Sequence, residues 1–112
     1  MSSTPLELWQ TEWCAASHRV RQRLTELGLP YFVRQVPVER ENRAELVSST
    51  GQHSIPALVA DGKVVAGEGA IVTYLNTHFA EPPEAEHQRA KAAKANRKEL
   101  EKACLELSAP TP

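Results

Sequence analysis

The stretch TEWCAASH at residues 11–18 decides the fold, because it marks the point where a short strand gives way to a helix. Residues 6–9 (LELW) alternate apolar and polar side chains, which predicts a strand. From Ala15 to Leu27, apolar residues recur every three or four positions, which predicts an amphipathic helix ended by Gly28. Cys14 is therefore expected to be the first residue of a helix that follows directly on a strand.

This position favours thiolate chemistry at Cys14. A helix N-terminus carries a partial positive charge and free backbone N–H groups, so a thiol held there ionises more easily. The fourth residue of the Cys-x-x-Cys pattern is Ser17 and not a second thiol. The sequence thus predicts a single nucleophile without an adjacent resolving partner. Ser17 either donates a hydrogen bond to the thiolate or faces solvent.

Length, charge and cysteine content exclude several classes of function. A chain of 112 residues with a net charge of −1 is expected to form one domain and lacks the basic footprint of a nucleic-acid binder. No apolar run approaches the roughly 20 residues of a membrane span, so no membrane partner is expected. Residues 1–5 carry no signal-peptide pattern, which predicts a cytoplasmic protein. Two distant cysteines make no metal framework, and Cys104 is interpreted as a buried apolar residue, with a resolving role as the alternative.

The rest of the chain divides into short elements separated by glycine and proline. They are a strand at residues 31–36 closed by Pro37, a short helix within 40–50 ending at Gly51, strands at 57–60 and 63–66 joined by the hairpin signal Asp61-Gly62, a helix opened by Gly67-Glu68-Gly69, and a helix at 84–107. The order is β-α-β-α-β-β-α plus a terminal helix. Pro37 suggests that its strand lies at an edge.

This order predicts a mixed four-stranded sheet with helices on both faces. The first two strands are expected to pair in parallel across the first helix, and the hairpin strands pair antiparallel. Pro82-Pro83 divides the chain into a core at residues 1–80 and a C-terminal helical extension of the same domain at 81–112. A sparse apolar stripe in that extension is expected to dock on the core; it consists of Leu100, Ala103, Cys104 and Leu107.

Three motifs, found in this order, carry a family resemblance. They are CAAS at residues 14–17, GQHSIP at 51–56, and GEGAI at 67–71 leading to Tyr74-Leu75. Together they resemble the thioredoxin fold and, more narrowly, the glutaredoxins and the N-terminal domain of glutathione transferases. The resemblance covers about residues 5–80. It implies an α/β, thioredoxin-like architecture.

The resemblance also implies a binding site for glutathione or another low-molecular-weight thiol. It places Pro56 in a cis peptide bond facing the cysteine, where the backbone of Ile55 can pair with an extended peptide thiol. It places the γ-glutamyl carboxylate at the helix that opens with Glu68 and Gly69, whose free N–H groups suit an anion. Glu68 either contacts the γ-glutamyl ammonium or simply favours the helix dipole. Gln52 is the candidate for the glycine end of the ligand.

Two departures from the family pattern predict weaker glutathione binding or a different thiol. Many glutaredoxins carry a lysine three residues before the cysteine, where this chain has Thr11, and transferases usually carry serine where it has Gly69. Around the nucleophile, Trp13 either shields the site or packs at the edge of the core, and His18 is expected on the surface. The arginines at positions 19, 21 and 23 are expected on a solvated helix face, with Arg19 able to add positive potential near the thiolate.

Three functions compete on this evidence. The leading hypothesis is a monothiol glutaredoxin-like oxidoreductase that uses Cys14 on glutathione mixed disulfides, with glutathione and glutathionylated proteins as partners and a monomer or weak dimer as its state. The second is a stand-alone domain like the N-terminal domain of glutathione transferases; only about 30 residues follow Phe79, which makes conjugation doubtful. The third is a non-enzymatic interaction module. Iron–sulfur cluster carriage ranks low because Ala15-Ala16 and Thr11 depart from the usual carrier motif.

Overall fold

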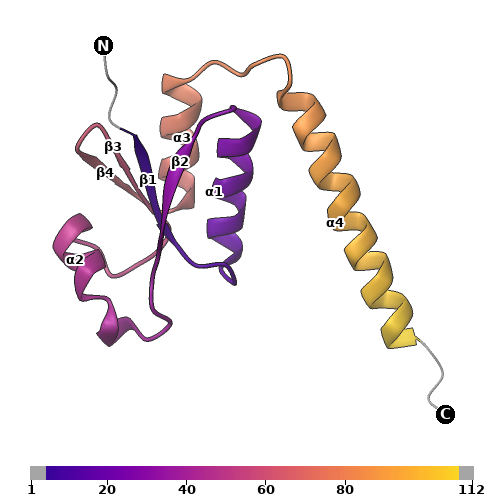
Figure 1. The fold of residues 1–112 in the computed structure, drawn as a ribbon, viewed down its shortest axis with the longest axis horizontal. Coiled ribbons are helices and arrows are strands. Elements are labelled where there is room, and N and C mark those ends of the chain that lie inside the picture. Colours follow the sequence, from indigo (N-terminus) through magenta and orange to yellow (C-terminus); the bar gives the residue numbers. More distant parts are fainter. Residues whose placement is uncertain (1–4, 109–112) are drawn as a thin grey trace.

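The computed structural model describes the backbone of residues 5–108 and the side chains of residues 5–97 (Figure 1). Its elements are β1 (Leu6–Gln10), α1 (Ala15–Glu26), β2 (Tyr31–Gln35), the 3₁₀ turn η1 (Arg40–Asn42), α2 (Ala44–Thr50), β3 (Ala57–Ala60), β4 (Lys63–Ala66), α3 (Glu68–His78) and α4 (Ala85–Ser108). This is the expected β-α-β-α-β-β-α order with an additional C-terminal helix, and it confirms the thioredoxin-like α/β architecture.

The four strands form one mixed sheet in the order β2-β1-β3-β4. β1 pairs with β2 in parallel, with Leu8 opposite Val33, and with β3 in antiparallel, with Leu8 opposite Leu58. β3 and β4 form the hairpin, in which Asp61 and Gly62 both have positive φ, as a two-residue type I′ turn requires. β2 lies at an edge of the sheet, as Pro37 predicted.

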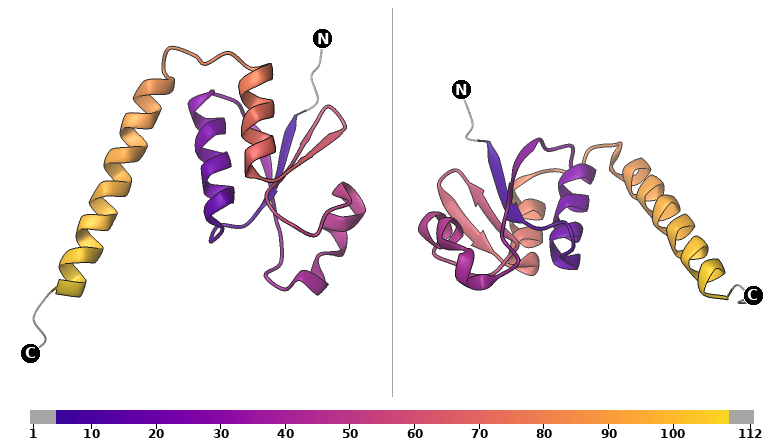
Figure 2. Two further views of the ribbon diagram at one scale, coloured as in Figure 1. Left: turned by 180° about the vertical axis from the view of Figure 1, so that it is seen from behind. Right: turned by 60° about the horizontal axis from the view of Figure 1, so that its bottom comes forward.

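Side chains alternate between two apolar clusters on opposite faces of the sheet. Leu8 and Leu58 are fully buried on the face covered by α1 and α3, which contribute Leu24 and Ile71 among others. The neighbouring residues Trp9 and Ala57 are buried on the opposite face with Leu46 of α2. Figure 2 shows α1 and α3 together on one side of the sheet and α2 on the other. The sheet is thus covered from both sides, which holds the C-terminal end of β1 and the start of α1 in a fixed position.

The segment at residues 40–50 differs from the single short helix that its composition predicts. It forms the η1 turn and then α2, and the backbone at Arg43 leaves the helical conformation between them (φ −97°, ψ 39°). Arg43 is itself buried, because its guanidinium reaches backbone carbonyls outside the helix. The predicted end of the helix is confirmed: Gly51 has φ 73° and donates its N–H to the Val47 carbonyl at 2.8 Å.

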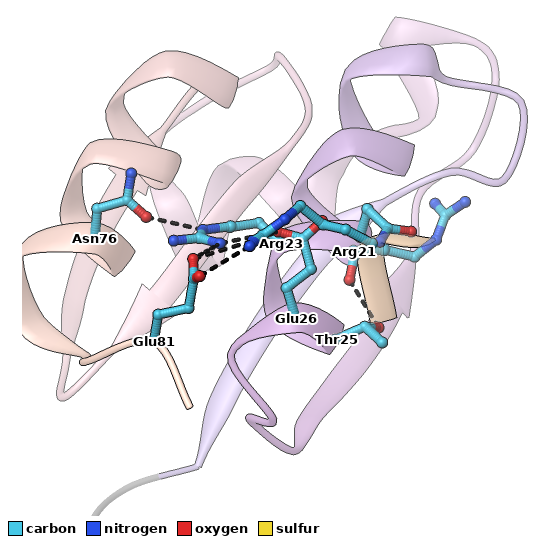
Figure 3. A network of polar contacts seen from close by, with 8 residues as sticks. Arg21, Arg23, Thr25, Glu26, Asn76 and Glu81 are labelled. Carbon is cyan, nitrogen blue, oxygen red and sulfur yellow. Dashed lines mark hydrogen bonds and ion pairs between the residues drawn. The ribbon is translucent and has the colours of Figure 1, made fainter. Parts of the chain in front are cut away.

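The first turns of α4 are held against the core by a charge cluster of Arg23, Glu26, Glu81 and Arg89, which we call the α4 charge cluster. Arg23 contacts Glu26 at 2.8 Å and Glu81 at 2.9 Å, and Arg89 contacts Glu81 at 2.9 Å and Glu26 at 3.4 Å. Figure 3 shows Arg23 and Glu81 meeting between α1 and α3, where Arg23 also binds Asn76. The expectation that Arg23 is solvated is therefore wrong, since its side chain is only 18% exposed.

Beyond this cluster, α4 points away from the sheet in every view (Figures 1 and 2). The expected docking of Leu100, Ala103, Cys104 and Leu107 concerns side chains that lie outside the described residues. The division of the chain near residue 80 stays a prediction. Within residues 5–108, the structure contains no helix long and apolar enough to span a membrane.

Candidate functional site

Cys14 is the N-cap of α1, so the helix begins at Ala15, one position after the start at Cys14 that the sequence predicted. Its backbone is extended (φ −82°, ψ 118°), and its Sγ accepts a hydrogen bond from the Ser17 backbone N–H at 3.4 Å. The Cys14 carbonyl accepts the first helical N–H, from His18, at 3.0 Å. The sulfur thus takes the place that a serine or aspartate oxygen usually takes at an N-cap, and it faces the positive end of the helix.

The pKa of the Cys14 thiol lies below its ordinary value. Partial burial opposes ionisation, but the hydroxyl and amide of Ser17, the amide of Ala16 and the charge of Arg19 together outweigh it. Each of these groups stabilises the thiolate because each presents positive charge or a hydrogen-bond donor to sulfur. The side chain is partly exposed. The Cys14 thiol is therefore accessible to reagents and ionises readily.

Ser17 is completely buried, so the alternative that it faces solvent is wrong. Its Oγ has no hydrogen-bond partner of good geometry among the described residues. The hydroxyl lies one helical turn from Cys14 and lowers the pKa of that thiol. Donation from this hydroxyl to the Cys14 thiolate, the other interpretation from the sequence, stays a prediction.

A second segment, the Pro56 loop (residues 51–56), connects α2 to β3. The Ile55–Pro56 peptide is cis, as the resemblance implied. Pro56 is buried, whereas Ile55 is partly exposed and packs on the cluster around Trp9. The loop is fastened by Arg43, whose guanidinium donates to the His53 carbonyl at 2.8 Å and to the carbonyls of Pro37 and Val38 at 2.9 and 3.0 Å.

The start of α3 is joined to both of the other segments. The Gly67 N–H donates to the Pro56 carbonyl at 2.9 Å, which ties the Pro56 loop to the helix start. Glu68 accepts a hydrogen bond from Arg19 of α1 at 2.6 Å, and this pairing lowers the pKa of the Glu68 carboxyl. Gly69 lies in the exposed first turn, where a Cβ would meet no atom within 4 Å. A serine side chain would therefore fit at this position.

The structure thus brings together most of the residues predicted for the site. Cys14 and Ser17 share one helix start, and Arg19 of that helix reaches Glu68, which is next to Gly69 and linked to Pro56 through Gly67. Gln52 is exposed, and no hydrogen bond joins its side chain to the other site residues in the described part of the chain.

The remaining neighbours of the nucleophile differ in exposure. Trp13 is 62% exposed and His18 is also exposed. Thr11 is buried, and its Oγ1 has no hydrogen-bond partner among the described residues. Its carbonyl accepts from the Cys14 N–H and from Arg21, both at 3.4 Å. At this position the chain offers a buried hydroxyl in place of a surface cation.

Two polar features around the site were missed by reasoning from the sequence. One is Arg43, for which no local pattern gives a signal. The other is the buried side chain of Gln10, which donates to Gln35 at 2.5 Å and accepts from Arg21. Arg21, expected to be solvated, has a side chain that is only 17% exposed. Arg21 braces the segment before Cys14 through the Thr11 carbonyl, and Arg43 braces the Pro56 loop through the His53 carbonyl.

The chemistry that this arrangement can support is thiolate exchange. An accessible thiol of lowered pKa can attack a disulfide, and no second cysteine lies in the same turn to resolve the product. Among the described side chains, no three His, Cys, Asp or Glu residues come together in a way that could hold a metal ion.

Comparison with solved structures shows the same fold in glutathione transferases. A rice glutathione transferase solved in complex with glutathione is 24% identical, with a TM-score of 0.63 over 82% of this chain and 45% of that one. An unclassified glutathione S-transferase from Bombyx mori is 20% identical, with a TM-score of 0.62 over 70% of this chain and 38% of that one. This chain spans less than half the length of these structures.

The family is shown by a different comparison. No curated protein sequence matches the chain. The family model described as Glutaredoxin matches residues 6–65, which is more than half of the chain and includes β1, Cys14, the Pro56 loop and the hairpin as far as Val65. The chain therefore belongs to the glutaredoxin family.

Proposed function

We propose that this protein is a monothiol thiol–disulfide oxidoreductase that acts on glutathione mixed disulfides through Cys14. The observation that carries the proposal is the N-cap position of Cys14, where Ser17 contributes both its amide and its hydroxyl and the pKa of the thiol is lowered. Membership of the glutaredoxin family supports the reaction class. Glutathione as the small thiol is supported by the transferase neighbours, one of which was solved in complex with it.

The reaction consists of two exchanges that balance without any other oxidant or reductant. The Cys14 thiolate attacks the glutathione sulfur of a protein–glutathione disulfide, the protein thiolate leaves and takes up a proton, and a Cys14–glutathione disulfide forms. A second glutathione, as its thiolate, then attacks the glutathione sulfur of that disulfide. Cys14 leaves as a thiolate, and oxidised glutathione is released.

Each site residue has a role in this scheme. Ser17 stabilises the Cys14 thiolate as nucleophile and as leaving group. The Ile55 backbone beside Pro56 pairs with the backbone of the bound thiol, and the first turn of α3 at Glu68 and Gly69 receives the γ-glutamyl end. Gln52 serves the glycine end. Because no second cysteine lies within one turn of Cys14, removal of glutathione is favoured over reduction of protein disulfides. We place the protein in the cytoplasm, where glutathione keeps thiols reduced.

The test is a coupled assay of glutathione release from a glutathionylated protein, with glutathione reductase regenerating the reduced thiol. We expect turnover by the wild-type chain and by Cys104→Ser, and none above the uncatalysed rate in Cys14→Ser. Ser17→Ala is expected to retain turnover at alkaline pH and to lose it toward acidic pH, because less thiolate remains. Undiminished turnover in Cys14→Ser would contradict the proposal.

The structural neighbours favour a second candidate function, glutathione conjugation. An assay with glutathione and an electrophilic aryl halide separates the two. Conjugation that survives Cys14→Ser, in a protein that does not reduce mixed disulfides, would favour the transferase-like function.

A further inference from the structure

Arg19 and Glu68 form an ion pair that connects the start of α1 to the start of α3. Arg19 Nε donates to Glu68 Oε2 at 2.6 Å, although the two residues are 49 positions apart in the chain. Both side chains keep contact with solvent, at 57% and 31% exposure. The pair therefore lies at the surface, between the segment that carries the nucleophile and the segment proposed to receive the γ-glutamyl end of the ligand.

Arg19 acts on two anionic groups at once. Against the opposing effect of burial, hydrogen bonds from Ser17 and Ala16 lower the pKa of the Cys14 thiol most, and Arg19 adds to them through its charge. It also lowers the pKa of Glu68, and Glu68 raises the pKa of Arg19 in return. One cation is thus shared between the nucleophile on α1 and a carboxylate on α3.

Because Arg19 is paired with Glu68, it stabilises the Cys14 thiolate less than an unpaired arginine would. A guanidinium paired with a carboxylate at hydrogen-bond distance is nearly neutral when seen from several ångströms away, so Glu68 cancels part of the field of Arg19 at Cys14. A second cation bound to Glu68 would cancel the carboxylate instead. The positive charge of Arg19 would then be opposed less at the sulfur, while the γ-glutamyl carboxylate of the ligand is neutralised by the backbone N–H groups at the start of α3.

We propose that Arg19 is a shared counter-ion: Glu68 restrains its charge in the free protein, and an ammonium-bearing thiol that engages Glu68 frees that charge to stabilise the Cys14 thiolate. The inference rests on the proposed function, because it takes the γ-glutamyl ammonium as the group that engages Glu68. It makes Arg19 a positioning residue that acts through Cys14 and does not itself touch the reacting atoms.

The coupling acts where the proposed reaction needs it. In the second exchange Cys14 is the leaving group, and a thiol of lower pKa leaves faster. A glutathione that occupies the start of α3 would therefore promote departure of the sulfur. A thiol without an ammonium group would bind without this effect, which gives the site a preference for γ-glutamyl thiols over simple ones.

The free protein tests the coupling without any ligand. The measurement is the rate of Cys14 alkylation by iodoacetamide, resolved by peptide mass spectrometry so that Cys104 does not contribute, at pH values below the pKa of the thiol. We expect Arg19→Gln to slow alkylation and Glu68→Gln to speed it, each roughly two- to fivefold, as exposed charge pairs allow. The double variant is expected to equal Arg19→Gln alone. Far above the pKa, all rates should converge.

Matched controls come from a similar ion pair away from the site. Arg34 and Glu7 are 3.1 Å apart with side chains 55% and 25% exposed. Arg34→Gln and Glu7→Gln should leave the alkylation rate of Cys14 unchanged. If Glu68→Gln speeds alkylation equally with and without Arg19, Glu68 acts directly on the sulfur and the proposal is overturned. It is equally overturned if Glu68→Gln has no effect.

The ligand arm uses γ-glutamylglycine, which has the ammonium group but no thiol, and its N-acetyl derivative, which lacks the ammonium. The readout is the ultraviolet absorbance of the thiolate during a pH titration. In the wild-type chain, γ-glutamylglycine should give more thiolate than its N-acetyl derivative, and in Arg19→Gln the difference should vanish. An equal response to both probes in the wild-type chain overturns release by the ligand. Neither arm measures turnover, so loss of mixed-disulfide reduction alone refutes the proposed function and not this coupling.

Discussion

Replacing Arg43 tests whether one buried side chain fastens the Pro56 loop. The residue is 7% exposed, and its three guanidinium nitrogens donate to the carbonyls of Pro37, Val38 and His53 at 2.8–3.0 Å. No carboxylate pairs with it among the described residues. Arg43→Met keeps the length of the side chain and removes every donor. Arg43→Lys keeps the charge but offers one nitrogen in place of a planar fork.

The expected loss of stability follows from these three contacts. A hydrogen bond from a charged donor contributes about 1.5–3 kcal/mol, so three of them contribute about 4.5–9 kcal/mol before any cost is subtracted. Removing the buried cation also relieves its desolvation cost, which offsets a large part of that sum. We expect Arg43→Met to lower the free energy of unfolding by about 2–4 kcal/mol and Arg43→Lys by about 1–2 kcal/mol.

Urea denaturation followed by circular dichroism measures the change in the free energy of unfolding. Amide hydrogen exchange shows which residues lose protection. Exchange should rise first in residues 51–56 and 37–38, before the strands are affected. Arg40→Met is the matched control, since Arg40 is exposed in the preceding turn and should change stability by less than about 0.5 kcal/mol. An Arg43→Met variant as stable as Arg40→Met would refute the reasoning, and so would increased exchange spread evenly over the sheet.

Three further predictions follow from the structure. Leu24→Ala should lower the free energy of unfolding in urea by about 2–5 kcal/mol, because Leu24 is fully buried between α1 and the sheet. The control is Val64→Ala, at a position 39% exposed, which should lower the same free energy by less than about 1 kcal/mol. Equal losses in the two variants would contradict the assigned core. Gly69→Ser should tighten glutathione binding by roughly two- to tenfold in calorimetry, because a side chain fits there and one hydroxyl contact adds about 0.5–1.5 kcal/mol; weaker binding would argue against the start of α3 as the γ-glutamyl site. Acid should loosen the start of α4. Burial raises the pKa of Glu26, but hydrogen bonds from Gln22, Arg23 and Arg89 outweigh it, and the pKa is lowered; Arg89 and Arg23 lower the pKa of Glu81 to about 2. A carboxylate with a depressed pKa stabilises the fold above its ordinary value of 4.5, and this contribution is lost as the pH falls toward 2. Exchange protection in the first turns of α4 should therefore decline over that interval, less so in Glu26→Gln, and protection independent of pH would refute the role of the α4 charge cluster.

Features with local signals were predictable from the sequence. The Asp61-Gly62 turn, the stop at Gly51 and the start of α1 all depend on residues next to one another, and each is confirmed within a residue or two. The helix-start position of Cys14, the candidate nucleophile, was predictable for the same reason, because a strand, a cysteine and an amphipathic helix follow one another directly. The burial of Ser17 was left open, because it depends on how α1 packs against the rest of the core.

Features assembled from distant residues were not predictable. Arg43 is buried because carbonyls from two separate loops lie around its guanidinium. No residue spacing in the chain predicts that these carbonyls come together. The arginines of α1 lie on the polar side of the helical repeat, where solvent is the usual neighbour. Arg23 instead meets Glu81 and Asn76 from other elements, and Arg21 meets Gln10. The family pattern pointed to Glu68, but only the folded chain places Arg19 beside it.

Because α4 is held to the core near one end, a small rotation at that end moves its far end over a large distance. With 24 residues the helix is about 36 Å long, and the α4 charge cluster holds it near one end. A rotation of about 10° at that end would displace the other by about 6 Å, which is several times any shift a packed core would accommodate. A pair of distance probes, one on the sheet and one near residue 108, would therefore report small rearrangements among four charged side chains as large changes in separation.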